Sequence, residues 1–197
     1  MSRWVRPPGP TGAPLRIGLL GGSFNPAHDG HLYVSTVAAH ALGLDYVWWL
    51  VSPGNPLKRA SEMADLLVRM AGARDVARDR RIIVTDIEAH LGTRYTIDSL
   101  RALLRRFPGT RFVWLMGSDN LRQFAQWKNW AGIARLMPIA VVRRPGSVLA
   151  PLQSPAIRRF GLARRLGPPP SILMLDGRRN PQSATRLRAL EPRLPSC

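Results

Sequence analysis

The sequence predicts a doubly wound α/β protein in which helices cover both faces of a parallel sheet. Short apolar runs alternate with longer amphipathic stretches along most of the chain, a pattern typical of repeated strand–helix units. Gly, Ser, Asn and Asp follow several of the apolar runs. In a parallel sheet such turns meet at the carboxyl edge, where these folds bind ligands. At 197 residues the chain is long enough for one domain with a proper core.

The expected elements follow from the period of the apolar residues. Continuous apolar runs predict buried strands at 16–21, 46–51, 81–87, 111–116, 138–142 and 172–175. The intervening stretches predict helices at 29–43, 61–74, 96–107, 127–136 and 183–190, and a helical stretch after 117–120.

Several helix ends carry the residues expected at such positions. Gly43 is the usual type of residue at a helix C-terminus, and Ser61 would cap the helix that follows it. Residues 52–56 predict a loop, and 144–170 predict a loop-rich insertion. The Pro-rich start predicts a disordered arm over 1–15, which leaves a single domain over 16–197.

The basic character of the chain does not by itself define a partner. The formal net charge is +17, and only Lys58 and Lys128 among the 29 basic side chains are lysines. The arginines are scattered along the chain rather than gathered in one tail, so a nucleic-acid-binding face is not indicated. Such a charge could reflect a nucleic-acid partner, an acidic membrane surface or an anionic substrate. An arginine-rich composition also arises from a genome rich in G and C without a functional demand, so no nucleic-acid partner is expected.

The location expected from the sequence is the cytoplasm. Cys197 is the only cysteine, so an internal disulfide is excluded and a reducing compartment fits. The first 15 residues lack the apolar core of a signal peptide. No apolar run approaches the roughly 20 residues that a membrane span needs, so no membrane partner is expected. The oligomeric state stays open, a homo-oligomer included.

The segment 21–31, Gly-Gly-Ser-Phe-Asn-Pro-Ala-His-Asp-Gly-His, carries the strongest chemical signal. It joins an expected strand to an expected helix, and the N-terminus of a helix favours anions. Its glycines allow close approach of the backbone, and Ser23 can donate a hydrogen bond. His28 and His31 can donate to phosphate oxygens, so the segment predicts a phosphate site. The alternative is a helix cap with two incidental histidines.

Other segments give weaker signals with structural alternatives. Asp119, in the turn after the strand at 111–116, could accept a hydrogen bond from a ribose hydroxyl or simply cap a helix. Trp127 or Trp130 could stack on a flat ring, although at helical spacing at least one of them is expected in the core. Lys58, beside Asn55, could bind a phosphate or lie solvated on the surface.

The segment 183–188, Ser-Ala-Thr-Arg-Leu-Arg, forms a second candidate anion site. Its hydroxyls and arginines lie at the start of an expected helix, where Arg can donate two hydrogen bonds to one phosphate. Helix capping by Ser or Thr is the alternative interpretation.

These motifs resemble those of a known superfamily. The segment 21–31 resembles the His-x-Gly-His signature of the nucleotidyltransferases, and 183–188 resembles their second signature. The segments 94–100, 117–121 with Trp127, and 142–146 are most similar to the bacterial nicotinate-nucleotide adenylyltransferases. The resemblance covers about residues 16–190 and implies a Rossmann-like nucleotidyltransferase fold.

The resemblance implies a role in NAD biosynthesis. The phosphate of nicotinate mononucleotide would attack the α-phosphorus of ATP, giving deamido-NAD and pyrophosphate, with Mg²⁺ assisting and no covalent enzyme intermediate. Catalysis would then consist of positioning and charge stabilisation. His28, His31 and Arg188 would be the catalytic residues, and Ser183 and Thr185 would join Arg188 on the β- and γ-phosphates.

The resemblance also implies a set of substrate contacts. Gly117 and Asp119 would contact a nucleotide sugar. The backbone near Tyr95 and Thr96, with Trp127 stacking, would recognise the nicotinate ring. Asn55 and Lys58 would contact the phosphate of the mononucleotide. The remaining residues expected to bind substrate are Gly22, Ser23, Phe24, Asn25 and Arg144.

Three alternatives stay open at this point. The acceptor could be nicotinamide mononucleotide or phosphopantetheine on the same fold. The chain could instead be a basic nucleic-acid-binding protein without catalysis. It could also be an ATP-binding regulatory module that lacks an acceptor pocket.

Overall fold

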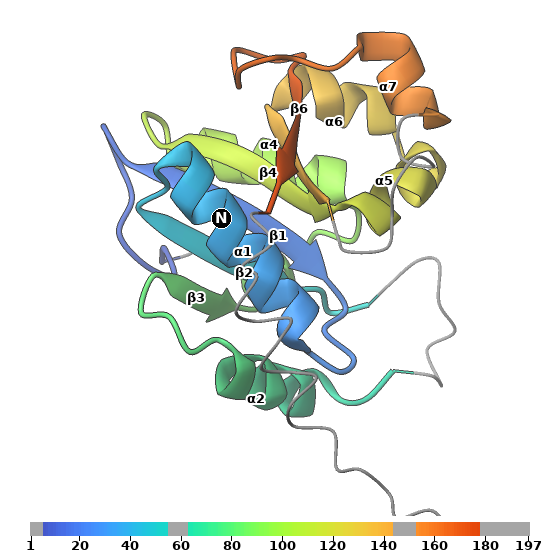
Figure 1. The fold of residues 1–197 in the computed structure, drawn as a ribbon. Coiled ribbons are helices and arrows are strands. Elements are labelled where there is room, and N and C mark those ends of the chain that lie inside the picture. Colours follow the sequence, from blue (N-terminus) through green and yellow to red (C-terminus); the bar gives the residue numbers. More distant parts are fainter. Residues whose placement is uncertain (1–5, 55–62, 144–152, 178–197) are drawn as a thin grey trace, which may run out of the picture.

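The computed structural model describes residues 6–54, 63–143 and 153–177 and has the doubly wound architecture that the sequence predicts (Figure 1). Six strands form one parallel sheet in the order β3-β2-β1-β4-β5-β6. The strands are β1 (Arg16–Gly22), β2 (Tyr46–Val51), β3 (Ile82–Thr85), β4 (Arg111–Gly117), β5 (Ile139–Arg143) and β6 (Ile172–Asp176). The helices are α1 (Asp29–Leu42), α2 (Leu66–Val76), α3 (Ile87–Leu91), α4 (Thr96–Arg106), α5 (Ser118–Gln123), the 3₁₀ helix η2 (Phe124–Gln126), α6 (Trp130–Leu136) and α7 (Pro155–Phe160).

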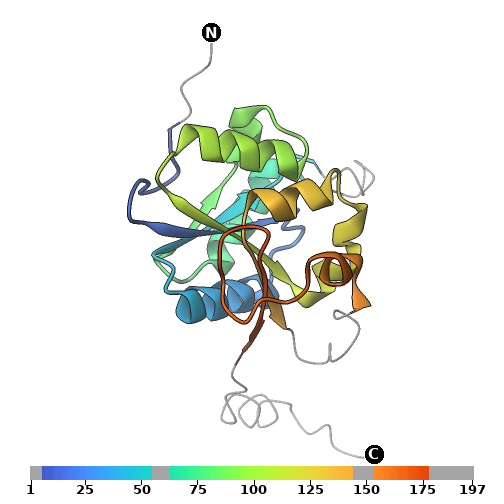
Figure 2. The ribbon, with the colours of Figure 1, turned by 90° about the horizontal axis from the view of Figure 1, so that it is seen from above.

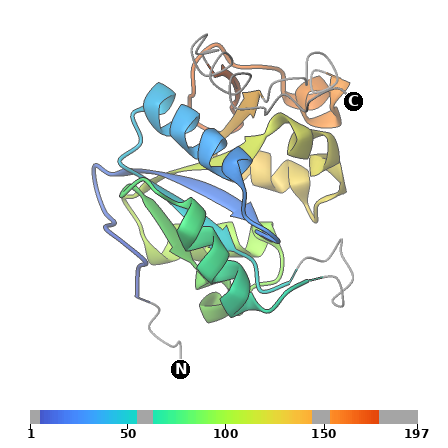
Figure 3. The same cartoon turned by 60° about the horizontal axis from the view of Figure 1, so that its bottom comes forward.

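Two hydrophobic cores lie on opposite faces of the sheet, because the side chains of a strand alternate between its faces. Leu19 on β1 packs with Trp48 and Trp114 under α3, α4 and α6. Its neighbour Leu20 packs on the other face with Trp49 under α1 and α2. Figure 2 shows α1 and α4 on opposite sides of the sheet, and Figure 3 brings α1 and α2 forward together.

Most expected elements are confirmed, and three boundaries were predicted wrongly. The helix expected at 127–136 begins at Trp130, because Asn129 caps it there and its Oδ1 accepts from the Gly132 N–H at 3.2 Å. The strand expected at 81–87 ends at Thr85, because the Thr85 hydroxyl accepts a hydrogen bond from the Ile87 N–H at 3.1 Å and α3 begins there. The helix expected from Ser61 begins at Leu66, capped by Asp65, whose Oδ1 accepts from the Leu67 N–H at 2.8 Å. Ser61 itself and the expected helix at 183–190 lie outside the described residues.

The two segments expected to be irregular contain more order than predicted. Residues 6–15 do not form a free arm: the Gly12 N–H donates to the Thr110 hydroxyl at 2.7 Å, and Leu15 packs against the core. These contacts join positions far apart in sequence, so composition alone does not reveal them. The insertion expected over 144–170 contains α7, capped by Ser154.

Gly21 on β1 is required by packing rather than by an unusual backbone angle. A Cβ atom at this position would overlap the indole ring of Trp114 on the neighbouring strand β4. The backbone φ of Gly21 is not positive. Gly43, in contrast, adopts the left-handed conformation that ends α1, as the sequence predicts.

The topology of the sheet indicates a ligand site at the carboxyl ends of β1 and β4. The chain order reverses between β1 and β4, which are neighbours in the sheet although far apart in sequence. Open parallel sheets bind ligands at the carboxyl edge beside such a switch point. The turns after β1 and β4 meet there.

None of the helices in the described parts of the chain combines the length and the apolar composition that a membrane span requires.

Candidate active site

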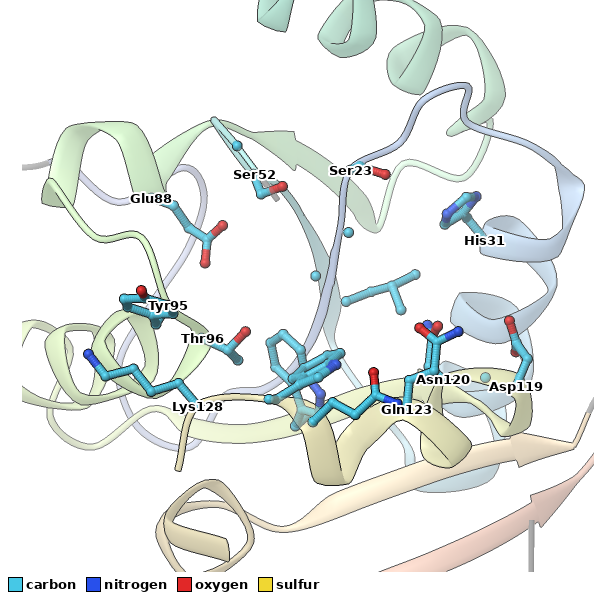
Figure 4. Close-up of a pocket in the computed structure, with 18 of the residues that line it drawn as sticks. Ser23, His31, Ser52, Glu88, Tyr95, Thr96, Asp119, Asn120, Gln123 and Lys128 are labelled. Atoms are coloured by element: carbon cyan, nitrogen blue, oxygen red, sulfur yellow. The ribbon is translucent and has the colours of Figure 1, made fainter. Parts of the chain in front are cut away.

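A cavity of ≈630 Å³ lies at this carboxyl edge (Figure 4). Its volume is within the range of about 300–1,000 Å³ that is usual for small-molecule sites. The walls come from the turns after β1, β2 and β4 and from the connections α3–α4 and η2–α6. It brings together most of the described residues expected at the site: Gly22, Ser23, His28, His31, Tyr95, Thr96, Gly117, Asp119 and Trp127.

His28 and His31 each perform a local structural task at the start of α1. The Nδ1 of His28, the N-cap residue, accepts a hydrogen bond from the Gly30 N–H at 3.1 Å. The Nδ1 of His31 accepts from the His28 N–H at 3.2 Å. A ring nitrogen that accepts carries no proton, so the neutral imidazole of His28 carries its proton on Nε2. The His31 Nδ1 also lies 3.3 Å from the His28 carbonyl oxygen, so the tautomer of His31 decides whether Nδ1 accepts or donates. In the tautomer in which Nδ1 accepts, both rings offer an Nε2–H donor, and the two interpretations of these histidines are compatible.

Phe24 supports this arrangement from behind. Its backbone has a φ of 48°, its side chain is 1% exposed, and its ring lies 4.5 Å from that of His31 and 5.1 Å from that of Trp49. Phe24 and Asn25 are not among the residues that line the cavity. The Phe24 side chain is buried, and the Asn25 Oδ1 accepts from the Ala64 N–H at 3.3 Å. The substrate contacts expected of Phe24 and Asn25 stay predictions.

Arg69 on α2 is a buried cation that the sequence analysis missed. It is 4% exposed, and its guanidinium donates at 2.8 Å to each of the carbonyl oxygens of Ser23, Ser52 and Ala64. Burial lowers the pKa of Arg69, and the charge of Asp65 opposes this effect. Arg69 thus ties together the backbones of the turns after β1 and β2.

A signal for Arg69 was present in the sequence. It lies on the inward stripe of α2 that Leu66, Met70 and Ala73 mark at helical spacing. An arginine on the apolar face of a helix needs hydrogen-bond acceptors within the fold. The carbonyl groups in the turns after β1 and β2 provide them.

The turn after β4 contributes Gly117 and Asp119. Gly117 is the N-cap of α5, and no side chain makes the capping hydrogen bond there. Asp119 is in the first turn of α5 and lines the cavity, so the alternative that it is the N-cap residue is wrong. In Figure 4 its carboxylate lies on the same side of the cavity as His31.

Aromatic side chains form the opposite end of the cavity. The indole of Trp127 makes near-perpendicular contacts with Trp114, at 6.0 Å and 82°, and with Phe124, at 5.5 Å and 75°. These contacts fix the plane of a half-buried ring that lines the cavity. Trp130 packs against Phe124 and Phe160 and does not line the cavity. Both tryptophans pack against the core, and of the two only Trp127 also lines the cavity.

Lys128 completes this end of the cavity and was not expected there. Its Nζ lies 4.1 Å from the centroid of the Tyr95 ring and 4.0 Å from an oxygen of Asp98. Figure 4 shows Lys128, Tyr95 and Thr96 grouped together, away from His31. The cavity therefore has an imidazole end and an aromatic end.

Glu88 on α3 is another charged residue at the cavity that the sequence analysis missed. It is 8% exposed, lines the cavity, and its Oε1 accepts from the Ser99 hydroxyl at 2.7 Å. Burial raises the pKa of Glu88, and the hydrogen bond from Ser99 opposes this effect. Its position just after β3, at the carboxyl edge of the sheet, was the signal that could have identified it.

Six of the expected site residues lie outside the described residues, and the structure tests none of them. They are Asn55, Lys58, Arg144, Ser183, Thr185 and Arg188.

The described part of the chain contains no group of three or more His, Cys, Asp or Glu side chains that could hold a metal ion. Mg²⁺ is usually held by one or two carboxylates together with substrate phosphates and water. The Asp119 carboxylate at the imidazole end of the cavity fits that more limited role.

The fold and the cavity together define a Rossmann-like nucleotidyltransferase, with the site at the switch point of the sheet. A family model described as cytidylyltransferase-like matches residues 19–190. The chain belongs to this family and, within it, to the nicotinate-nucleotide adenylyltransferases.

Relatives from several bacteria carry that name. A "Probable nicotinate-nucleotide adenylyltransferase" of Parvibaculum lavamentivorans is 53% identical over 183 residues, which are 88% of this chain and 91% of that protein. One of Erythrobacter litoralis is 51% identical over 193 residues, 93% of this chain and 88% of that protein.

A solved structure with a similar fold is the nicotinic acid mononucleotide adenylyltransferase of Plasmodium falciparum complexed with NaAD. Its TM-score is 0.66 at 16% sequence identity, over 84% of this chain and 76% of that one. At this level of identity the likeness supports the fold.

Proposed function

We propose that this protein transfers the adenylyl group of ATP to nicotinate mononucleotide, giving deamido-NAD and pyrophosphate. One observation carries the proposal: a single cavity joins an end lined by two histidines at a helix N-terminus to an end lined by Trp127 and Tyr95. The first end suits phosphates and the second suits a flat ring. The relatives described above support the same activity.

The reaction forms one bond and breaks one bond at the α-phosphorus of ATP. A phosphate oxygen of the mononucleotide attacks, and the bond from the α-phosphorus to the bridging oxygen breaks to release pyrophosphate. Negative charge spreads over the phosphoryl oxygens in the transition state. The Nε2–H groups of His28 and His31 would donate to these oxygens from rings that are already held in place, so little reorganisation is needed.

The turns around this end would align the two substrates. Arg69 holds the carbonyls of Ser23 and Ser52, which keeps the loop after β1 against the turn after β2. Gly117 and Asp119 would contact a nucleotide sugar. Ser183, Thr185 and Arg188 would hold the β- and γ-phosphates, as the second signature implies.

Mg²⁺ would accompany ATP and neutralise part of the charge on its phosphates. Asp119 is the described carboxylate best placed to meet it at the imidazole end. Among the described residues, the protein's own contribution is to orient the phosphates through its imidazoles and backbone N–H groups.

The acceptor is tested by supplying ATP and Mg²⁺ with one candidate at a time and following pyrophosphate release. Nicotinate mononucleotide should support turnover, with nicotinamide mononucleotide slower and phosphopantetheine inactive. Faster turnover with either of the other two would change the acceptor. Binding of ATP without turnover on any acceptor would favour a regulatory module. Tight binding of nucleic acid with a steep salt dependence and no turnover would favour the non-catalytic alternative.

A further inference from the structure

Glu88 is a buried carboxyl group that has no role in the reaction proposed above. It lies in α3 and is 8% exposed, yet it contributes to the wall of the cavity. Figure 4 shows its carboxylate pointing into the cavity beside Tyr95 and Thr96. A carboxyl group in such a place is costly to bury as a charge, so its surroundings should explain it.

A chain of hydroxyl groups ends at this carboxyl group. The Ser99 hydroxyl donates to Glu88 Oε1 at 2.7 Å. The Thr93 and Ser99 hydroxyl oxygens lie 2.8 Å apart, and either of them could be the donor of that pair. The Thr93 N–H also donates to the Glu88 carbonyl oxygen at 3.1 Å. Of these contacts, the one from Ser99 reaches the Glu88 side chain, and it supplies a hydrogen bond but no positive charge.

Within the described residues, Glu88 forms no ion pair. Two cations line the same cavity but have other contacts. Lys128 lies near Asp98 and over the Tyr95 ring, and the Arg94 guanidinium lies 5.8 Å from that ring's centroid. Burial without a cationic partner is consistent with the raised pKa of Glu88. Among the described residues, the Glu88 carboxyl group at the cavity wall thus has a hydrogen-bond donor but no cationic partner.

We propose that Glu88 is a specificity residue whose carboxylate pairs with the positively charged pyridinium ring of the acceptor. The identity of this ring rests on the function proposed above. A pyridine ring joined to ribose through its nitrogen carries a fixed positive charge, unlike phosphopantetheine. The neighbouring aromatic rings of Tyr95 and Trp127 also favour a cation over their faces.

The same contact would reject acceptors without a charged ring. An uncharged occupant would cover Glu88 and remove its access to water without providing a counter-charge. The selection acts on the charge of the ring nitrogen. It is therefore separate from any recognition of the carboxylate that distinguishes nicotinate from nicotinamide.

The test varies the charge on both partners by isothermal titration at neutral pH. Nicotinate mononucleotide and its 1,4-dihydro form differ in ring charge and share the ribose phosphate. The substitution Glu88→Gln should weaken binding of the charged form about tenfold or more, and binding of the dihydro form less than about twofold. Asp86→Asn removes a nearby carboxylate that does not line the cavity, and should change neither affinity.

Equal weakening of both ring forms by Glu88→Gln would assign the residue a structural role and overturn the proposal, as would no change for either form. Should Glu88→Gln not fold, titration of the wild-type protein still decides: equal affinity for the two forms rejects a ring-charge contact. Turnover of the wild-type protein with ATP tests the proposed function separately. Selective binding of the charged ring without turnover would overturn that function and leave the role of Glu88 standing.

Discussion

Replacing His28 separates its two tasks, because another residue type can perform one of them. His28 caps α1 through Nδ1 and would donate to phosphate through Nε2. Asn is among the best N-cap residues but lacks the second donor. We therefore expect His28→Asn to keep the stability of the wild-type protein. His28→Ala should lose about 1 kcal/mol of the free energy of unfolding and, for a chain of this size, about 2–4 °C of Tm.

Both substitutions should reduce turnover about a hundredfold or more, a loss of roughly 3 kcal/mol that is typical for one preorganised donor. Pyrophosphate release under saturating ATP and nicotinate mononucleotide measures the turnover, and thermal unfolding measures the cap. His40→Ala, an exposed histidine in the last turn of the same helix, provides a control that should retain turnover. Wild-type turnover in His28→Asn would refute the reasoning, because His28 would then act only as a cap.

Three further substitutions test the supporting structure. Arg69→Met removes the donor to three part-buried carbonyl groups and should cost about 2–4 kcal/mol in urea unfolding, against less than about 0.5 kcal/mol for the exposed Arg74→Met; equal losses would deny Arg69 its bridging role. Trp127→Ala should weaken mononucleotide binding by about 1–2 kcal/mol and hardly alter ATP binding, whereas equal weakening of both in calorimetry would indicate packing. Because burial raises the folded-state pKa of Glu88, its carboxyl group favours folding below the ordinary glutamate value of about 4.3 and loses that contribution as pH rises. The free energy of unfolding of Glu88→Gln relative to wild type should therefore increase towards neutral pH, and a gap that stays constant would contradict this sign.

The regular elements were predictable because local patterns determine them. The strand expected at 46–51 matches β2, since a continuous apolar run is bounded by Asp45 and by Ser52 with Pro53. α3 was missed because its five residues are too few to show a helical period. It begins where the Thr85 hydroxyl accepts a hydrogen bond, and a single side chain of this kind is a weak signal in sequence.

Some residues of the candidate site could likewise be predicted from local sequence, and others could not. His28, His31 and Trp127 were expected because they lie in or beside motifs that are contiguous in sequence. Arg69 and Glu88 depend on contacts with distant segments. The role of Arg69 depends on the carbonyl groups that the fold brings to its guanidinium, and the role of Glu88 depends on its burial without a cationic partner. Neither can be read from the sequence, because both arise only when the chain folds.

The close packing of Gly21 against Trp114 has a consequence for engineering. Trp114 in turn contacts Trp127. A methyl group added at position 21 would therefore displace Trp114 and, through it, Trp127 at the aromatic end of the cavity. Enlarging position 21 alone creates a collision, and shrinking position 114 alone leaves a void. Attempts to broaden the range of accepted rings will therefore need matched, simultaneous changes in adjacent strands.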